Sequence, residues 1–148
     1  MKNSYQASCL CGAVEVEIQG KISDIIHCHC SKCRKNSGTA YATNGFVKAT
    51  DFVIKKNLDV NGQDALNYFE MAPGKKRHFC SVCACPIYSS NEADPTRIRF
   101  RLGLLDSEIE ERPMSHNFVS SKACWDKLDD KLPRYDGHEP SRLSDGAP

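Results

Sequence analysis

The sequence predicts a mainly β fold of short strands joined by turns, with little helix. Three observations support this prediction. Apolar and polar residues alternate over residues 13–18 and again over residues 96–102, as expected for strands with one buried face. Glycine or proline flanks the candidate strands, at Gly12, Gly20 and Pro73-Gly74. No long segment shows the periodicity of an amphipathic helix.

Other segments fit the same fold. Residues 39–47 and 66–69 are rich in β-forming residues, and residues 116–119 predict a further strand. Residues 31–37 are polar and predict a single helical turn. In residues 96–102 the alternation places three arginines on one face, namely Arg97, Arg99 and Arg101. We expect these arginines to form cross-strand ion pairs with the acidic residues that follow, and binding of a dianion is the alternative. The acidic residues are Asp106, Glu108, Glu110 and Glu111.

Length and charge limit the classes of protein that the chain can belong to. With 148 residues it has the size of one domain, and we expect this domain at residues 1–136 and a loose tail at residues 137–148. Twenty basic and nineteen acidic residues give a net charge of +1, so we expect no nucleic-acid partner. The N-terminus resembles no signal peptide and no segment is apolar enough to cross a bilayer. The sequence therefore predicts a cytoplasmic protein with no membrane partner.

Eight of the nine cysteines lie in three clusters, Cys9-x-Cys11, Cys28-x-Cys30-x-x-Cys33 and Cys80-x-x-Cys83-x-Cys85. In a reducing compartment such short spacings favour metal ligation, with zinc as the expected ion. Two groupings are open from spacing alone. Cys9 and Cys11 can join Cys80 and Cys83, which leaves Cys28, Cys30 and Cys33 as a trio. Alternatively, Cys30 and Cys33 can join Cys80 and Cys83 as in a zinc ribbon.

The three clusters and their surroundings resemble the glutathione-dependent formaldehyde-activating enzyme family, which also contains centromere protein V type proteins. The resemblance is carried by residues 8–14 (SCLCGAV), 28–38 (CHCSKCRKNSG) and 79–83 (FCSVC), and it continues to residue 136. It implies a small β-tent fold of two antiparallel sheets. Two positions depart from the family pattern: Ala84-Cys85 replaces a glycine and a small residue, and Cys124 replaces a proline before Trp125.

The resemblance also implies two zinc ions per chain. Cys9, Cys11, Cys80 and Cys83 would hold a structural zinc, and Cys28, Cys30 and Cys33 would hold a catalytic zinc with one open position. The implied reaction joins glutathione to formaldehyde and gives an S-hydroxymethyl adduct. The chain is thus expected to be a carbon–sulfur lyase or synthase whose partners are a small thiol and an aldehyde. The alternative is a non-catalytic, zinc-stabilised binding module.

Chemistry favours a thiol as the missing ligand. Three thiolates leave the zinc centre with one negative charge, which makes it a poor activator of water, whereas a soft thiol suits such an ion.

Around this site, we expect His29 to donate a hydrogen bond to a cysteine sulfur. The basic segments at residues 32–35 and 75–78 could each receive a carboxylate of glutathione, and the second is more readily interpreted as an exposed hairpin. Cys85, Cys124 and Trp125 are expected to be buried.

Overall fold

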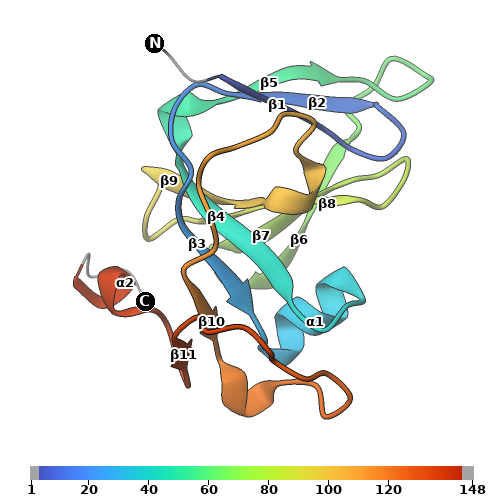
Figure 1. Cartoon of the computed structure of the whole chain (residues 1–148). Coiled ribbons are helices and arrows are strands. Elements are labelled where there is room, and N and C mark those ends of the chain that lie inside the picture. Colours follow the sequence, from blue (N-terminus) through green and yellow to red (C-terminus); the bar gives the residue numbers. More distant parts are fainter. Residues whose placement is uncertain (1–3, 145–148) are drawn as a thin grey trace.

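The computed structural model describes residues 4–144, which form two β-sheets and two short helices (Figure 1). The smaller sheet contains β1 (Tyr5–Ser8), β2 (Val14–Ile18) and β5 (Phe52–Asn57), with β2 in the centre. It lies across one end of the larger sheet (Figure 1). The predicted mainly β fold with two sheets and little helix is confirmed.

The larger sheet has eight strands: β3 (Ser23–Cys28), β4 (Ala42–Lys48), β6 (Leu66–Ala72), β7 (Lys75–Cys80), β8 (Pro86–Asn91), β9 (Arg97–Arg101), β10 (Ser115–Asn117) and β11 (Arg134–Tyr135). Their spatial order is β11-β10-β3-β4-β9-β8-β7-β6. All neighbours are antiparallel except β10, which runs parallel to both β3 and β11. At this edge the sheet departs from the antiparallel pattern, because long connections return the chain there in the same direction.

The alternating segments form strands as predicted. In β2, Val14, Val16 and Ile18 are buried, and in β9 the same holds for Ile98 and Phe100. The main core takes buried residues from both sheets. A second, smaller cluster contains four buried residues beside α1, namely Ile26, Cys28, Cys33 and Ala42.

Two short helices and three 3₁₀ turns complete the described part of the chain. Helix α1 (Ser31–Ser37) begins at Cys30, whose Sγ accepts a hydrogen bond from the Cys33 N–H. It ends at Gly38, whose φ of 70° suits glycine because a Cβ there would be strained. The remaining elements are η1 (Ala49–Asp51), η2 (Leu102–Leu104), η3 (Val119–Ser121) and α2 (Pro140–Ser144). No helix in the described part of the chain has the length and apolar character needed to span a membrane.

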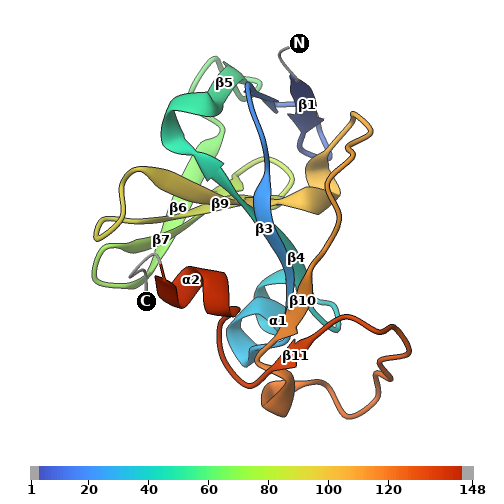
Figure 2. The ribbon, with the colours of Figure 1, turned by 60° about the vertical axis from the view of Figure 1, so that its left-hand side comes forward.

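The C-terminal segment was expected to be a loose tail, and for residues 137–142 that expectation is wrong. Glu139 is completely buried and accepts a hydrogen bond from Asn117 Nδ2 at 2.5 Å. Its other oxygen accepts from Arg142 Nε at 3.0 Å, and Arg142 is also buried. A buried ion pair, in which both Glu139 oxygens accept a hydrogen bond, therefore holds this segment, although it has few large apolar residues. Residues 145–148 lie outside the described residues. Figure 2 shows α2 below β6, β7 and β9 of the larger sheet.

The expected burial of Cys124 and Trp125 is also wrong. Cys124 is exposed, and Trp125 has 71% of its surface accessible. Both lie in the connection between η3 and β11, where Ala123 is the buried residue. Neither side chain belongs to the core.

Candidate metal centres and active site

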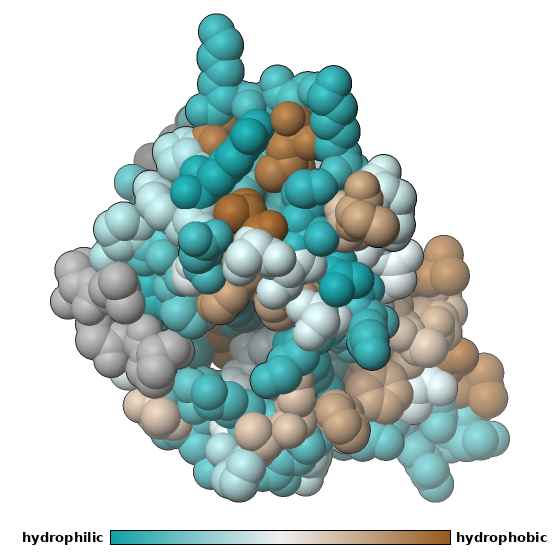
Figure 3. All heavy atoms as spheres, turned by 90° about the horizontal axis from the view of Figure 1, so that it is seen from below, coloured by the Kyte–Doolittle hydropathy of each residue, from teal (hydrophilic) through white to brown (hydrophobic). Residues whose placement is uncertain are grey.

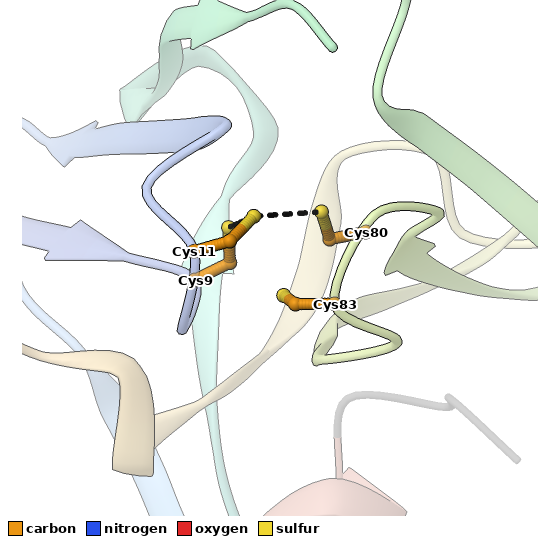
Figure 4. A group of neighbouring side chains, drawn as sticks. All are labelled: Cys9, Cys11, Cys80 and Cys83. Carbon is orange, nitrogen blue, oxygen red and sulfur yellow. Dashed lines mark hydrogen bonds between the residues drawn. The ribbon is translucent and has the colours of Figure 1, made fainter. Parts of the chain in front are cut away.

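Four cysteines from two loops face one another (Figure 4). Cys9 and Cys11 follow β1, and Cys80 and Cys83 lie at the end of β7 and in the turn that leads to β8. Their four sulfur atoms all lie within 4.8 Å of one another. The fold thus brings together two loops that lie about seventy residues apart in the sequence.

The sulfur separations fit a tetrahedral zinc site. A Zn–S bond of about 2.3 Å in a tetrahedron places neighbouring sulfurs about 3.8 Å apart. The Cys9–Cys11 and Cys11–Cys80 sulfur distances are 3.7 and 3.8 Å. The Val14 N–H also donates to the Cys9 sulfur at 3.3 Å, as is usual around ligating thiolates. This donor set is therefore suited to a closed, four-thiolate zinc.

The second cluster contains three cysteines around the start of α1. Cys28 ends β3, Cys30 is the N-cap of the helix and Cys33 lies in its first turn. Their sulfurs also lie within 4.8 Å of one another. Cys28 and Cys33 are buried and Cys30 is partly exposed, so the trio is accessible from one side. Three converging thiols and one accessible side suit a zinc ion with an open position.

These are the two groups of three or more potential ligands found among residues 4–144. They correspond to the grouping that the family resemblance implies, and the ribbon-like grouping of Cys30 and Cys33 with Cys80 and Cys83 does not occur there. Cys85 belongs to neither group. It is partly buried against the main core, and burial raises the pKa of its thiol.

The groups around Cys33 favour a negative charge on its sulfur. Hydrogen bonds from the thiols of Cys28 and Cys30 lower the pKa of Cys33, and the guanidinium groups of Arg77 and Arg101 lower it further. The same shared hydrogen bonds, together with burial, raise the pKa of Cys28. Arg77 Nη2 lies 4.0 Å from the Cys33 sulfur. Cys33 therefore carries a negative charge more readily than an isolated thiol does.

The trio opens into a cavity of about 370 Å³. This volume is within the range of about 300–1,000 Å³ that is common for small-molecule sites. The space-filling view from below shows a hollowed face with mainly hydrophilic residues around the opening (Figure 3). Strands β4, β7, β8 and β9 and helices α1 and α2 all contribute to its walls.

The walls are strongly cationic. Eight lysines and arginines line the cavity: Lys32, Lys75, Lys76, Arg77, Arg97, Arg99, Arg101 and Arg142. Among the described lining residues, Asp94 is the one acidic side chain. Of the two basic segments singled out in the sequence, residues 75–77 line the cavity and are not merely an exposed hairpin, while residues 32–35 contribute only Lys32.

The prediction that the three arginines of β9 would form cross-strand ion pairs is mostly wrong. Arg97 does pair with Asp94, at 2.6 Å, but this residue is three positions earlier in the chain. Arg101 donates to Asn44 Oδ1 at 2.6 Å and to Ser89 Oγ at 3.1 Å, and burial lowers its pKa to about 10. Neither neutral partner could be identified from the sequence, because pairing between distant strands determines both.

His29 does not donate to a cysteine sulfur as expected. Its ring is buried, with Nε2 at 2.8 Å from Nδ1 of His116, whose Nε2 is 2.8 Å from Asp130. His27 lies beside this group, with Nδ1 at 2.7 Å from Thr43 Oγ1. Residues that alternate along an extended segment point to opposite sides, so the histidines lie on the face opposite the cysteines. Burial, followed by the charge of His116, lowers the pKa of His29 to about 4.

Comparison with known proteins agrees with this arrangement. The family model described as glutathione-dependent formaldehyde-activating enzyme matches residues 4–121, which include all seven cysteines of the two groups. The chain belongs to the glutathione-dependent formaldehyde-activating enzyme family. The prediction of this family from the cysteine motifs is confirmed.

Relatives of this family member are distant. A Halomonas elongata protein is 27% identical over 129 residues, which cover 85% of this chain and 82% of the relative. Proteins of Aspergillus flavus and Aspergillus oryzae are each 32% identical over 122 residues, which cover 76% of this chain and 59% of each relative. All three are named as glutathione-dependent formaldehyde-activating enzymes, and each name is itself provisional. This chain thus spans about three fifths of the length of the Aspergillus proteins.

A solved structure shares the fold. The crystal structure of a Rhodobacter sphaeroides protein superposes with a TM-score of 0.56 at 21% identity, and the match covers 71% of this chain and 91% of that chain. At this identity the likeness concerns the fold alone. In the present family member, Arg142 and the rest of α2 lie beyond the residues that the family model matches.

Ala84 has an unfavourable backbone conformation. Its φ is +63°, and its N–H donates to the Cys80 carbonyl at 2.7 Å in the turn that carries Cys83. Such a φ costs a residue with a Cβ about 1–2 kcal/mol, part of which is offset because glycine is more flexible when unfolded. We expect Ala84→Gly to stabilise the zinc-loaded protein by up to about 1 kcal/mol and to raise its Tm by a few degrees in thermal unfolding.

Gly62→Ala is the reciprocal control. Gly62 has a φ of +77° and a Cβ there would meet nothing within 4 Å, so this change adds only the backbone strain. It should lower the Tm. A decrease in Tm for Ala84→Gly would show that the positive φ at Ala84 does not destabilise the turn.

Proposed function

We propose that this chain is a zinc-dependent carbon–sulfur lyase or synthase. It joins a small thiol, with glutathione as the expected substrate, to formaldehyde or a related small electrophile. The observation that carries the proposal is the trio of Cys28, Cys30 and Cys33 at a cationic cavity, in a chain of this family. Two zinc ions per chain are proposed, one in the four-cysteine group and one in the trio.

The donor sets support different roles for the two ions. Four converging sulfurs fill a tetrahedral zinc and suit a structural role. In the trio, a bound zinc would supply a site at which a thiol binds and loses its proton at neutral pH. Arg77 and Arg101 lie near Cys33 and stabilise negative charge on the sulfurs.

The remaining walls suit the substrate. Glutathione carries two carboxylates. Eight cations and one acidic side chain stand among the described lining residues, and this excess of positive charge attracts such a ligand and holds it in the cavity. In the reaction, the thiol sulfur forms a bond to the carbonyl carbon while the carbonyl π bond breaks. The proton lost by the thiol ends on the hydroxymethyl oxygen, and the reverse reaction cleaves the carbon–sulfur bond.

A reducing compartment fits this chemistry. All nine cysteines are free, and thiols remain free mainly in the cytoplasm. We therefore propose a cytoplasmic location, where glutathione is also the abundant small thiol.

The test measures the rate at which formaldehyde and glutathione exchange with their adduct, by magnetisation-transfer NMR. Because the reaction also proceeds without a catalyst, we expect an added rate that is proportional to protein concentration and is lost on removal of zinc. Cys124→Ser, which changes an exposed cysteine outside both groups, should retain this rate. A wild-type protein that adds nothing to the uncatalysed rate would contradict the proposal and favour the binding module.

A further inference from the structure

Three guanidinium groups gather around one aromatic ring in the wall of the cavity. The Cζ atoms of Arg97, Arg99 and Arg142 lie 4.1, 5.0 and 4.8 Å from the centre of the Phe46 ring. Arg97 and Arg99 come from one face of β9, Phe46 comes from β4, and Arg142 comes from α2. The cation–π attraction to the Phe46 ring stabilises each guanidinium group. Three positive charges this close together also repel one another, and anions between them would relieve the repulsion.

The acidic residues nearby do not satisfy all of these donors. Asp94 accepts from Arg97, and Glu139 accepts from Arg142 Nε and from Asn117. Arg142 Nη1 lies 2.6 Å from His138 Nδ1. Within residues 4–144, however, the buried Nη2 atoms of both Arg99 and Arg142 have no hydrogen-bond partner.

Unsatisfied, buried guanidinium nitrogens indicate a ligand. Arginine stays protonated, so it cannot relieve its burial by losing a proton, although burial lowers the pKa of Arg99. Both arginines line the cavity that the cysteine trio lines. A carboxylate has two oxygens, which can accept one hydrogen bond from each of the two Nη2 groups. Its negative charge makes these hydrogen bonds stronger than those to a neutral ligand.

We propose that Arg99 and Arg142 form a subsite for a carboxylate of the thiol substrate, so that the protein selects thiols that carry an anionic group. This inference rests on the proposed function for the identity of the ligand. The two arginines act as specificity residues, since they position the substrate whose sulfur meets the trio. Arg142 belongs to the segment held by Glu139 and Asn117, beyond the matched family residues, so this chain's own C-terminal segment provides part of the specificity.

The test measures binding of S-methylglutathione to the zinc-loaded protein by titration calorimetry. Its sulfur is capped, so binding reports the subsite rather than thiol ionisation. We expect Arg99→Gln and Arg142→Gln each to weaken binding about tenfold or more, since each removes a charge-assisted hydrogen bond. Wild type should also prefer S-methylglutathione over its dimethyl ester, and both variants should lose most of this preference. Arg112→Gln, at an exposed arginine outside the cavity, is the matched control and should bind as wild type does.

Arg142→Gln also removes the ion pair with Glu139, whereas Arg99→Gln leaves that ion pair intact and tests the subsite alone. Unchanged Tm values show that both variants are folded. Equal affinity of wild type for the acid and the ester, or Arg99→Gln binding as tightly as Arg112→Gln, would overturn the proposal. Failure of the proposed function gives a different pattern, in which S-methylglutathione binding still depends on the two arginines but the protein does not accelerate adduct formation.

Discussion

Cys83→Ser is expected to remove one zinc ion per chain and to lower the Tm by about 10 °C or more. Cys83 is one of four sulfurs that join the loop after β1 to the turn after β7. Structural zinc contributes about 10–16 kcal/mol in small zinc-binding peptides, which is as large as the whole stability of an ordinary domain. Even a partial loss of about 5 kcal/mol would lower the Tm by about 10–20 °C in a chain of this size. Thermal unfolding and metal analysis of the purified variant check this result.

Cys124→Ser is the control for this change, because Cys124 is exposed and belongs to neither cysteine group. It should retain two zinc ions and the wild-type Tm. A Cys83→Ser protein that also retained both ions and its Tm would contradict the structural role of the four-cysteine group.

Cys30→Ser is expected to abolish catalysis and leave the fold intact. Loss of one of three zinc ligands should reduce the rate of adduct formation by about 100-fold or more, through weaker metal binding and a changed site. The free energy of unfolding should change little, because serine can replace cysteine at the start of α1. Cys30 is the N-cap of α1, and serine is among the preferred N-cap residues, so the helix keeps its first hydrogen bond. Exchange NMR and thermal unfolding on the same sample measure both effects.

The comparison of Cys30→Ser with Cys83→Ser separates the two functions considered for this chain. An enzyme with an open site predicts lost turnover at position 30 and lost stability at position 83. Equal loss of Tm in the two variants would instead assign a structural role to the trio and favour the binding module. Unchanged turnover in Cys30→Ser would contradict its role as a ligand of the catalytic zinc.

Local patterns in the sequence were sufficient to predict several elements. Alternation identified β2 and β9, and the polar segment that follows Cys30 forms the short helix α1. The cysteine spacings identified the family, because such clusters join segments that the metal brings together. These features depend on neighbouring residues, so they can be interpreted without knowing the three-dimensional structure.

The cavity walls depend on contacts between distant segments and were harder to predict. Alternation placed Arg99 and Arg101 on one face of a strand, but it did not show that this face lines the cavity beside the cysteines. The polar composition of residues 137–148 suggested a loose tail, whereas Glu139 and Arg142 form a buried pair there. Buried ion pairs leave no apolar pattern in the sequence, so charged composition alone is a poor guide to order. The position of His29 between two cysteines predicts a contact with sulfur, but its side chain lies on the opposite face, against His116.

The proposed function depends on a metal ion held by Cys28, Cys30 and Cys33, with one position open to a thiol. The most direct measurement is titration of the cobalt-substituted protein with glutathione, followed in the absorption bands that report thiolate coordination. We predict two metal ions per chain and a saturable spectral change that corresponds to one of them and is absent in Cys30→Ser. A fully loaded protein that binds only one ion, or a spectrum that glutathione leaves unchanged, would contradict this proposal.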